Sequence, residues 1–375
     1  MVTSVQKTRY HPVVALSVAA LAFGAITLGN QALAAGSCVG SFATQVDCTV
    51  DALNVGPPIN TQLSTGNALV GTGVYTFTVN NPANTWTVKT GSPTITVTAD
   101  GLSRLDALAL GIAPPQYNVP GVLSTNWGAL VASVGTNYFP VATGGAVISN
   151  LSGALKLMAW DVDQVGNSGT QSVTIRQSTD PKLLAGVNVF ARTQSLNSND
   201  YNNGTQFNLG PGLADSGVTL EASKAYAIRP TDTAQTYGLG PQANRVSTAD
   251  GLAAFGVCGP VQSTWCEPVN NPSGVATSFA NPGSPGFLFG ELVALVVNSA
   301  GTAGKYYAVG DGTTLTGLDG HLYLLIWDSD PTDNYGFVNV RVDLAAVPEP
   351  ATLVLLGGGL LGLLLARRRR AHRNV

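Results

Sequence analysis

A ten-residue motif that occurs twice is the feature that most restricts what this chain can fold into. Trp160–Gly169 reads WDVDQVGNSG and Trp327–Gly336 reads WDSDPTDNYG, so the two segments lie 167 residues apart and share Trp, Asp, Asp, Asn and Gly at matching positions. The flanks recur as well, because a Leu-x-Leu segment precedes each motif and a Val-x-Ile or Val-x-Val segment follows it. A repeat of this kind predicts two copies of one structural unit.

The residues around each motif favour β-strands. The motif is too rich in Gly, Asn and Asp for a strand and reads as a turn between two strands. Residues 338–344 alternate between apolar and polar side chains, which is typical of a half-buried strand. The chain between its two ends is rich in Gly, Thr, Asn and Val and poor in Lys and Glu, and this composition disfavours helices.

These patterns predict an all-β fold with two tandem antiparallel β-sandwiches. We expect the first sandwich at 70–178 and the second at 186–344, with 35–69 as an N-terminal strand or linker. The predicted first strands of the two copies are Thr94–Thr98 and Ser216–Leu220.

The N-terminus predicts a helical secretory signal peptide over residues 1–34. Lys7 and Arg9 provide a basic start, and an uncharged apolar run follows. Ala32-Leu33-Ala34 has the small-x-small pattern that signal peptidase cleaves, so we expect the mature chain to begin at Ala35, with cleavage between Ala34 and Ala35. The alternative is an uncleaved anchor, for which the apolar run is short.

The C-terminal residues 347–375 contain three features in a fixed order. A Pro-Glu-Pro triplet comes first, an uncharged apolar run over 351–366 predicts a helix, and four arginines follow. An arginine cluster after such a run should stay cytoplasmic. The residues that define the order are Pro348, Glu349, Pro350, Arg367, Arg368, Arg369 and Arg370.

This order resembles the PEP-CTERM sorting signal. The resemblance implies that an exosortase recognises the tail and removes it at the outer face of the inner membrane. The chain would then be exported across that membrane, anchored in it through the C-terminal helix for a time, and finally placed at the cell surface or outside the cell. A plain C-terminal tail anchor is the alternative.

Charge and cysteine content support an exported body. Seven of the 18 basic residues and one of the 21 acidic residues lie in the two end segments, which leaves a body with a net charge near −9. Such a body lacks the basic surface that nucleic-acid binding requires. An even number of cysteines in an exported chain predicts disulfides. Three pairings can be drawn, and spacing favours Cys38 with Cys48 and Cys258 with Cys266.

The two acidic turns are candidate calcium sites. Calcium takes six to eight oxygen ligands from carboxylates, amides and carbonyls of loops. The alternative is a solvated turn whose Asp and Asn side chains cap their own backbone. The second copy has the larger set of such side chains, and the first copy favours a structural turn. The candidate ligands are Asp328, Asp330, Asp333, Asn334, Asp161, Asp163 and Asn167.

Both copies resemble the calcium-dependent galactose-binding lectins of the PA-I type. The shared pattern is Gly-x-Leu-Val, a loop, Gly-x-Leu-x-Leu, an Asp-rich turn, Asn-x-Gly and an alternating last strand. The resemblance implies a jelly-roll-like sandwich in which Asp and Asn side chains of the turn hold calcium, and calcium holds sugar hydroxyls. The turn here is shorter than in those lectins, and Asp333 stands where they have an amide.

The sequence favours a binding protein over an enzyme. His321 is the only histidine between the two ends, and no Gly-x-Ser-x-Gly elbow surrounds a serine. Our first hypothesis is a non-catalytic envelope or matrix protein that binds calcium and, through it, exopolysaccharide. The second is a structural matrix protein without a specific ligand, and the third is a secreted hydrolase. Trp160 and Trp327 are predicted to be core residues rather than sugar-stacking platforms.

Overall fold

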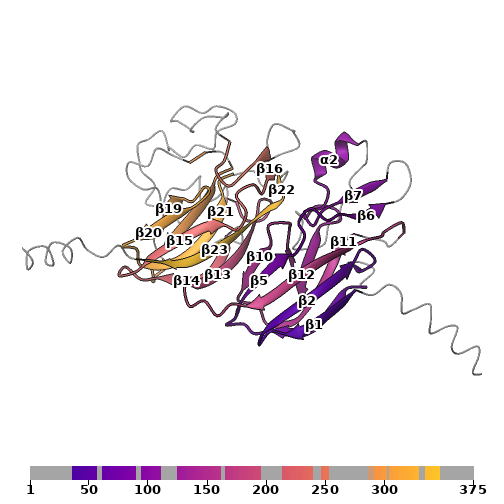
Figure 1. Ribbon diagram of the computed structural model, residues 1–375. Helices are drawn as coiled ribbons and strands as arrows, with labels where there is room; N and C mark the ends of the chain where they lie inside the picture. Colours follow the sequence, from indigo (N-terminus) through magenta and orange to yellow (C-terminus); the bar gives the residue numbers. More distant parts are fainter. Residues whose placement is uncertain are drawn as a thin grey trace, which may run out of the picture. The chain divides into compact units, whose positions relative to one another are not determined.

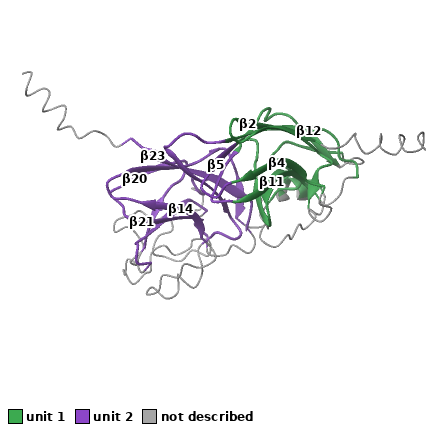
Figure 2. Cartoon of the chain, turned by 90° about the horizontal axis from the view of Figure 1, so that it is seen from below, with its two compact units in different colours: residues 1–69, 77–145, 152–176 green, residues 70–76, 146–151, 177–375 purple. Residues whose placement is uncertain are grey.

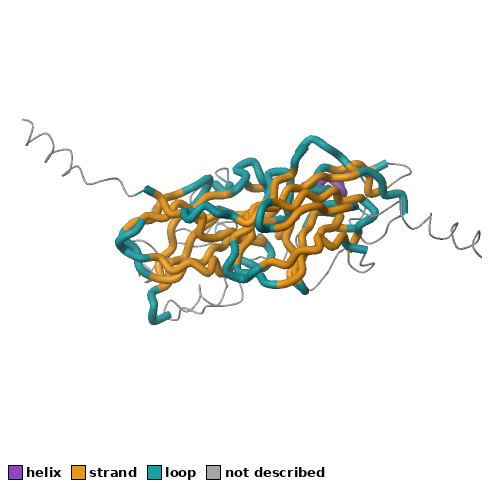
Figure 3. The backbone as a smooth tube through the Cα atoms, turned by 60° about the horizontal axis from the view of Figure 1, so that its bottom comes forward, coloured by secondary structure: helices purple, strands orange, loops and turns teal. Residues whose placement is uncertain are grey.

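The computed structural model describes most of the chain between its two ends as short β-strands (Figure 3). Among the described residues one short helix is present, α2 (Arg104–Ala109), so the all-β prediction is confirmed. The described ranges are 36–56, 61–89, 94–110, 125–161, 165–195, 213–239, 246–252, 287–288, 290–301, 304–328 and 334–346.

The chain divides into two compact units (Figure 2). Unit 1 contains Met1–Leu69, Phe77–Gly145 and Ser152–Arg176. Unit 2 contains Val70–Thr76, Ala146–Leu151 and Gln177–Val375. Each unit therefore combines segments that are far apart in the sequence.

Unit 1 is built from two larger sheets and a small ribbon (Figure 1). One sheet includes, in this order, β1 (Ser37–Ser41), β2 (Gln45–Asp51), β12 (Thr170–Gln177) and β5 (Val74–Val79). The other has the order β3 (Val55–Gly56), β11 (Gly153–Trp160), β8 (Leu130–Val134) and β9 (Asn137–Pro140), with β4 (Leu63–Leu69) also paired to β11. The ribbon consists of β6 (Trp86–Lys89) and β7 (Ile95–Val97).

Unit 2 has two four-stranded sheets and a three-stranded one (Figure 1). The first has the order β13 (Leu183–Phe190), β23 (Phe337–Ala345), β15 (Ala225–Pro230) and β20 (Thr313–Thr316). The second has the order β14 (Ala214–Leu220), β21 (Gly320–Ile326), β18 (Leu292–Val297) and β19 (Gly304–Ala308). The third has the order β17 (Val246–Ser247), β16 (Tyr237–Leu239) and β22 (Asn334–Tyr335), and β10 (Ala146–Ser149) also belongs to this unit.

Alternating side chains determine which face of each strand enters the core. In β14 the residues with odd numbers (215, 217 and 219) are exposed and those with even numbers are buried, as expected for a strand with one wet face. Side chains of β13, β15, β20 and β23 share one core with those of β14, β18 and β21, so the two four-stranded sheets of unit 2 pack face to face. The strand β18 is buried on both faces, since a second apolar cluster covers its other side.

The first residues of the body are part of the fold rather than a linker. Residues 35–69 were expected to be an N-terminal strand or linker without an assigned attachment; the described residues among them form β1 to β4, and β2 and β4 pair with β12 and β11. The reason is physical: alternate residues of β2, including Val46, Cys48 and Val50, are buried, so this strand supplies part of the core.

The predicted first strands of the two copies are not counterparts. Thr94–Thr98 contributes β7, which pairs with β6, whereas Ser216–Leu220 lies in β14, which pairs with β21. The strand of unit 1 that makes the same contacts as β14 is β4. Ser216 donates its hydroxyl to the carbonyl of Leu322 at 2.6 Å, and Thr65 donates to the carbonyl of Leu155 at 3.0 Å.

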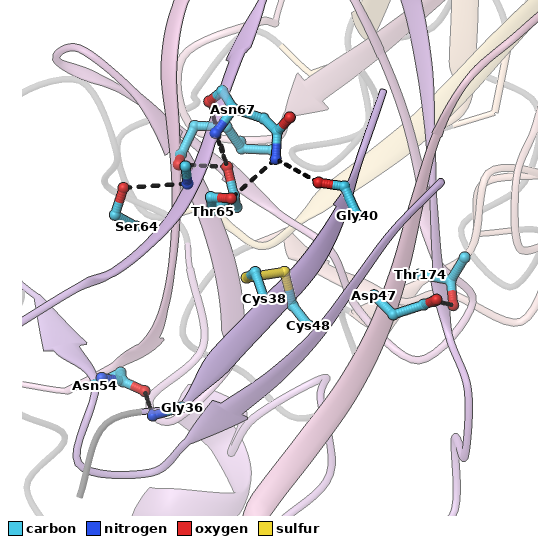
Figure 4. Close-up of a disulfide and its surroundings, with 12 residues drawn as sticks. Gly36, Cys38, Gly40, Asp47, Cys48, Asn54, Ser64, Thr65, Asn67 and Thr174 are labelled. Atoms are coloured by element: carbon cyan, nitrogen blue, oxygen red, sulfur yellow. Dashed lines mark hydrogen bonds between the residues drawn. A yellow bond between two sulfur atoms is a disulfide. The ribbon is translucent and has the colours of Figure 1, made fainter. Parts of the chain in front are cut away.

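A disulfide joins β1 to β2 near the predicted mature N-terminus. Cys38 and Cys48 are directly opposite each other in the antiparallel register and are bonded (Figure 4), which confirms this pairing. Gly36 just before β1 donates its backbone N–H to the side chain of Asn54 (Figure 4). The strand β1 is mostly exposed, and among the described strands it pairs with β2 alone, so the disulfide fixes an edge strand.

Several predictions concern residues outside the described ranges. These are the signal peptide with Ala34 and Ala35, the Cys258–Cys266 pair, and the tail from 347 onward. Within the described ranges, no helix combines the length and the apolar character needed to span a bilayer.

One buried asparagine ties β10 into unit 2. Asn339 in the centre of β23 donates its side-chain amide to the carbonyl of Val147 at 2.9 Å and accepts the N–H of Val147 at 2.8 Å. The same amide donates to Asn188 at 2.6 Å. The side-chain amide of Asn339 thus makes the two hydrogen bonds to the backbone of Val147 that the backbone of a neighbouring strand would otherwise make. Gly186 permits this approach, since a Cβ there would lie 2.2 Å from the Val147 carbonyl.

We expect Asn339→Ala to destabilise unit 2 by about 3 kcal/mol, because it leaves the buried N–H and carbonyl of Val147 without partners. Urea unfolding followed by tryptophan fluorescence would measure the loss. Thr314→Ala, at an exposed position of β20, is the matched control and should change stability by less than about 0.5 kcal/mol. Equal behaviour of the two variants would contradict the role assigned to Asn339.

We expect the double substitution Cys38→Ser with Cys48→Ser to lower the free energy of unfolding by roughly 2–3 kcal/mol, because a disulfide closing a loop of this size restricts the unfolded chain. Hydrogen exchange should show the loss first in β1, the edge strand. Protection lost equally in β1 and in the central strand β12 would argue against local release of the edge.

Candidate functional site

The first acidic turn begins where β11 ends. Asp161 follows Trp160 and is 2 % exposed, so its carboxylate needs local donors. Asn167 provides one, since its side-chain N–H donates to Asp161 Oδ2 at 3.0 Å. The same amide nitrogen donates to the carbonyl of Ala52 at 3.0 Å, at the end of β2. Asn167 therefore connects the turn to a strand of the facing sheet.

The second acidic turn has the same arrangement. Asp328 is 3 % exposed and Asn334 is 1 % exposed. The side-chain N–H of Asn334 donates to Asp328 Oδ2 at 2.8 Å and to the carbonyl of Ala191 at 3.1 Å. Ala191 follows the last residue of β13. Two of the sequence-predicted site residues are thus brought together in each unit, an aspartate and an asparagine.

Backbone contacts lock both turns in the same way. The N–H of Ala52 donates to the carbonyl of Gly169 at 3.0 Å, and the N–H of Ala191 donates to that of Gly336 at 3.1 Å. Both glycines have positive φ, 96° and 88°. A Cβ at Gly336 would lie 2.8 Å from Tyr237 Cβ, so the close approach of the turn to β16 requires glycine at this position.

A large aromatic side chain lies beside each turn and donates a hydrogen bond to a backbone carbonyl. Trp86 donates its indole N–H to the carbonyl of Gly128 at 2.9 Å. Tyr237 donates its hydroxyl to the carbonyl of Gly290 in the same way. Burial raises the pKa of Tyr237, so it stays a neutral donor. The sequence analysis did not identify Trp86 and Tyr237 as equivalent residues, because the two are of different types.

A second repeated segment lies beside the turns. Thr98–Leu102 and Thr248–Leu252 both read TADGL. The carbonyls of Ala99 and Ala249 accept N–H groups from Leu130 and Leu292, each at 2.8 Å, so the segment occupies an equivalent place in the two units. The identity of these five residues was the sequence signal that could have revealed the equivalence of the two segments.

The two units differ in charge around this segment. In unit 1 Asp100 accepts the backbone N–H and the hydroxyl of Thr143, at 2.8 and 2.6 Å. In unit 2 Asp250 accepts the N–H of Asp311 at 2.7 Å, so a second carboxylate replaces the hydroxyl. Burial, and then repulsion by Asp250, raise the pKa of Asp311.

Glu291 adds a further carboxyl in unit 2, where unit 1 has Ala129 in the matching Gly-x-Leu-Val segment. Its side chain is buried and accepts the N–H of Leu288 at 2.7 Å. Burial raises the pKa of Glu291, and the charge of Asp250 acts in the same direction. Unit 2 therefore concentrates more negative charge near its turn than unit 1 does.

The tryptophans that open the motifs are buried. Trp160 packs at 5.3 Å from Tyr138, and Trp327 packs at 4.6 Å from Phe287 and 5.2 Å from Tyr306, measured between ring centroids. Both belong to apolar clusters and cannot present a ring face to solvent.

His321 lies on β21, where its Nε2 is 2.6 Å from an Asp215 oxygen.

The oxygen atoms around Asp328 fit a hard cation. The Oδ1 atom of Asn334 is buried and has no hydrogen-bond partner among the described residues, and it belongs to the same side chain whose amide nitrogen donates to the Asp328 carboxylate. A carboxylate next to a buried amide oxygen is a donor pair that calcium takes. Asp163, Asp330 and Asp333 lie outside the described ranges. In the part of the chain that the structure describes, no three His, Cys, Asp or Glu side chains form a metal-binding group.

Comparison with known proteins identifies the C-terminal segment. A family model for the PEP-CTERM protein-sorting motif matches residues 346–370. The chain carries a PEP-CTERM sorting signal. Such a motif implies export and anchoring through the C-terminus before exosortase cleavage.

No curated protein matches the chain. Among solved structures it is similar to one described as "EclA N-terminal domain; PllA-like lectin", with 15% sequence identity and a TM-score of 0.24, over 44% of this chain and 98% of that one. A TM-score this low decides neither fold nor function.

We expect Glu291→Gln to raise the melting temperature at neutral pH by a few degrees. A carboxyl whose pKa is raised by folding stabilises the fold below its unfolded pKa, and this contribution is lost as pH rises through the folded pKa. Glutamine keeps an acceptor for the N–H of Leu288 without the buried charge. The difference from wild type should vanish below about pH 4, where carboxyls are protonated in the unfolded chain as well.

Calorimetry across this pH range in the presence of a chelator would test the expectation, with Asp319→Asn at an exposed position as control. A gap that is independent of pH would show that the effect of Glu291 is steric and not electrostatic.

Proposed function

We propose that this protein is a non-catalytic envelope or matrix protein that is exported, sorted through its PEP-CTERM tail, and binds calcium at the acidic turn of unit 2. The calcium would in turn hold hydroxyl groups of an exopolysaccharide. The proposal is supported by the sequence resemblance to calcium-dependent lectins and by the chemistry of Asp328 and Asn334. Two tandem copies of one lectin-like sandwich are part of this proposal.

The observation that carries the proposal is the buried oxygen pair. Asp328 is a carboxylate with almost no solvent contact that accepts the side-chain N–H of Asn334, and the Oδ1 atom of Asn334 accepts no hydrogen bond from the residues that the structure describes. Buried acceptors of this kind are costly unless a donor or a cation satisfies them. Asp330 and Asp333, on the same turn in sequence, are the residues that would complete a calcium ligand set.

Unit 1 is proposed as the weaker site. Its motif has Gly166 where unit 2 has Asp333, so Asp161, Asp163 and Asn167 are the remaining candidate ligands. The hydrogen bond between the asparagine and the aspartate of the motif forms in both units, at 3.0 Å in unit 1 and 2.8 Å in unit 2, so it does not distinguish the two sites. The same observation favours the alternative function, a structural matrix protein in which both turns only hold strands together.

We expect calcium to raise the melting temperature of the full chain and Asp328→Ala to abolish most of that shift. A ligand at about 100 times its Kd stabilises a protein by roughly 2.7 kcal/mol, and the variant should lose this increment whatever its own stability. Asp161→Ala, the equivalent change in unit 1, is the matched control and should retain most of the shift. Differential scanning calorimetry with calcium, and with magnesium at the same concentration, measures both.

We further expect the wild-type protein to be retained on an acidic exopolysaccharide or galactan resin with calcium and to elute with a chelator. Asp328→Ala should flow through. A calcium shift without retention would support a structural calcium site and contradict sugar binding. Absence of a calcium shift in wild type would contradict the calcium proposal and leave the structural alternative.

A further inference from the structure

The strand β23 connects the candidate site to the sorting signal. It begins at Phe337, one residue after the acidic turn ends at Gly336, and it ends at Ala345, one residue before the matched motif begins at residue 346. Its nine residues span roughly 30 Å at about 3.3 Å each. The turn and the tail therefore lie at opposite ends of the same strand.

The last residues of β23 are held firmly in the sheet. Ala345 pairs with Ala225 and Leu344 pairs with Tyr226 of β15. On the other side the N–H of Leu344 donates to the carbonyl of Lys182 at 2.7 Å. Since the strand lies between β13 and β15, its end cannot extend outward without breaking pairs on both sides.

The connection from this strand to the bilayer is short. Five residues, 346–350, separate β23 from the uncharged run that begins at residue 351. Even fully extended, the six Cα–Cα steps from Ala345 to residue 351 reach about 20 Å. While the tail is in the membrane, the end of unit 2 that carries Ala345 must stay within that distance of the apolar core.

Two lysines flank the end of β23. Lys182 precedes β13 and Lys224 precedes β15, and both strands run antiparallel to β23. With neighbouring strands about 4.8 Å apart, the two lysines lie on either side of the tail's exit, about 10 Å from each other in the plane of the sheet. Both are exposed. Acidic groups are present too, because Lys224 pairs with Glu221 at 2.6 Å and Asp180 accepts the N–H of Lys182.

We propose that this end of unit 2 lies against the lipid headgroups of the bilayer until the tail is removed, with Lys182 and Lys224 toward anionic lipids, and that the Asp328–Asn334 turn points away from the membrane. The inference rests on the proposed role of the tail as a membrane segment. It adds an orientation, so that the candidate site is available to a polymer outside the membrane while the precursor is still anchored.

Spin labels at the two ends of β15 test this orientation. Ser223 lies in the turn before β15 and Thr233 in the turn after it, and both are exposed. Each would be replaced in turn by a ketone-bearing residue that accepts a nitroxide, which leaves the four cysteines untouched. The chain from residue 35 to 375 would be reconstituted into vesicles that contain phosphatidylglycerol and a lipid with a nickel chelate on its headgroup.

We expect the nickel lipid to enhance relaxation of the label at 223 several-fold more than that of the label at 233, because the second label lies farther from the headgroups by the length of β15. A flexible Gly/Ser insert of about 12 residues between Ala346 and Val347 should weaken the effect at 223, since its root-mean-square span is about 20 Å. In the insert variant, the further substitutions Lys182→Gln and Lys224→Gln should reduce the relaxation enhancement at 223 again. Each lysine that is lost should lower the fraction of molecules docked on the headgroups by up to about fivefold.

The outcomes separate the inference from its premise. Vesicles that float without the chain would contradict the membrane role of the tail. A chain that floats with them but shows equal relaxation at 223 and 233 would overturn the proposed orientation and leave that role intact. An insert variant that keeps the full effect, even after both lysines are replaced, would show that other residues make the headgroup contact.

Discussion

The side-chain amide of one asparagine in each motif holds together three parts of the chain. Asn167 and Asn334 each donate from the same nitrogen to an aspartate at the start of the turn and to a backbone carbonyl at the end of a strand in the other sheet. An aspartate with 2–3 % exposure is tolerated only where donors compensate its charge. The asparagine side chain therefore connects the turn, the strand before it and the facing sheet, and the backbone bonds of Ala52 and Ala191 to the glycine that ends each turn act together with it.

The Asp–Asn contact of the acidic turn is the same in both units, but the charged residues around it differ. Unit 1 has Ala129 and Thr143 where unit 2 has Glu291 and Asp311, and the pKa values of both of these carboxyls are raised. Of the two, Glu291 is buried, and a buried carboxyl whose pKa is raised lowers stability at neutral pH unless a cation is near, a loss that natural proteins often accept at functional sites. The added negative charge supports unit 2 as the proposed calcium-binding unit, since a divalent cation would reverse the local preference for protonation.

The sequence predicted the strands better than their arrangement. Period-two patterns identify β14 and β23 because the apolar face of each meets a core, and burial of Trp160 and Trp327 follows from the apolar runs they end. The expectation that β23 is only half-buried is wrong, since Asn339 and Asp343 on its polar face are buried as well. Spacing favoured the Cys38–Cys48 bond because the two residues can face each other across a short hairpin. Strand formation, the burial of a strand's last residue and pairing across a short hairpin depend on residues close in sequence, so local sequence patterns predict them.

The missed features depend on residues far apart in the chain. The partner of Asn167 is Ala52, 115 residues away, and an alanine carbonyl leaves no mark in the sequence. The starts of the copies were misplaced because the distance between equivalent residues changes along the chain: the TADGL segments are 150 residues apart, whereas the Trp-Asp motifs are 167 apart. Insertions change the offset along the chain: Thr65 lies 151 residues before its counterpart Ser216, whereas the motif offset of 167 sets residue 49 against Ser216 and so does not lead to β4.

The strand pairing also explains how both ends of the chain can be processed without unfolding the body. The first strand, β1, starts at Ser37, just after the predicted cleavage site, and Cys48 is bonded to Cys38 within it. The last strand, β23, makes its final pairs at Ala345, just before the sorting motif. Removal of either end segment therefore breaks no strand pair among the described residues. The exported body can keep the buried Asp328–Asn334 contact unchanged from the anchored precursor to the mature form.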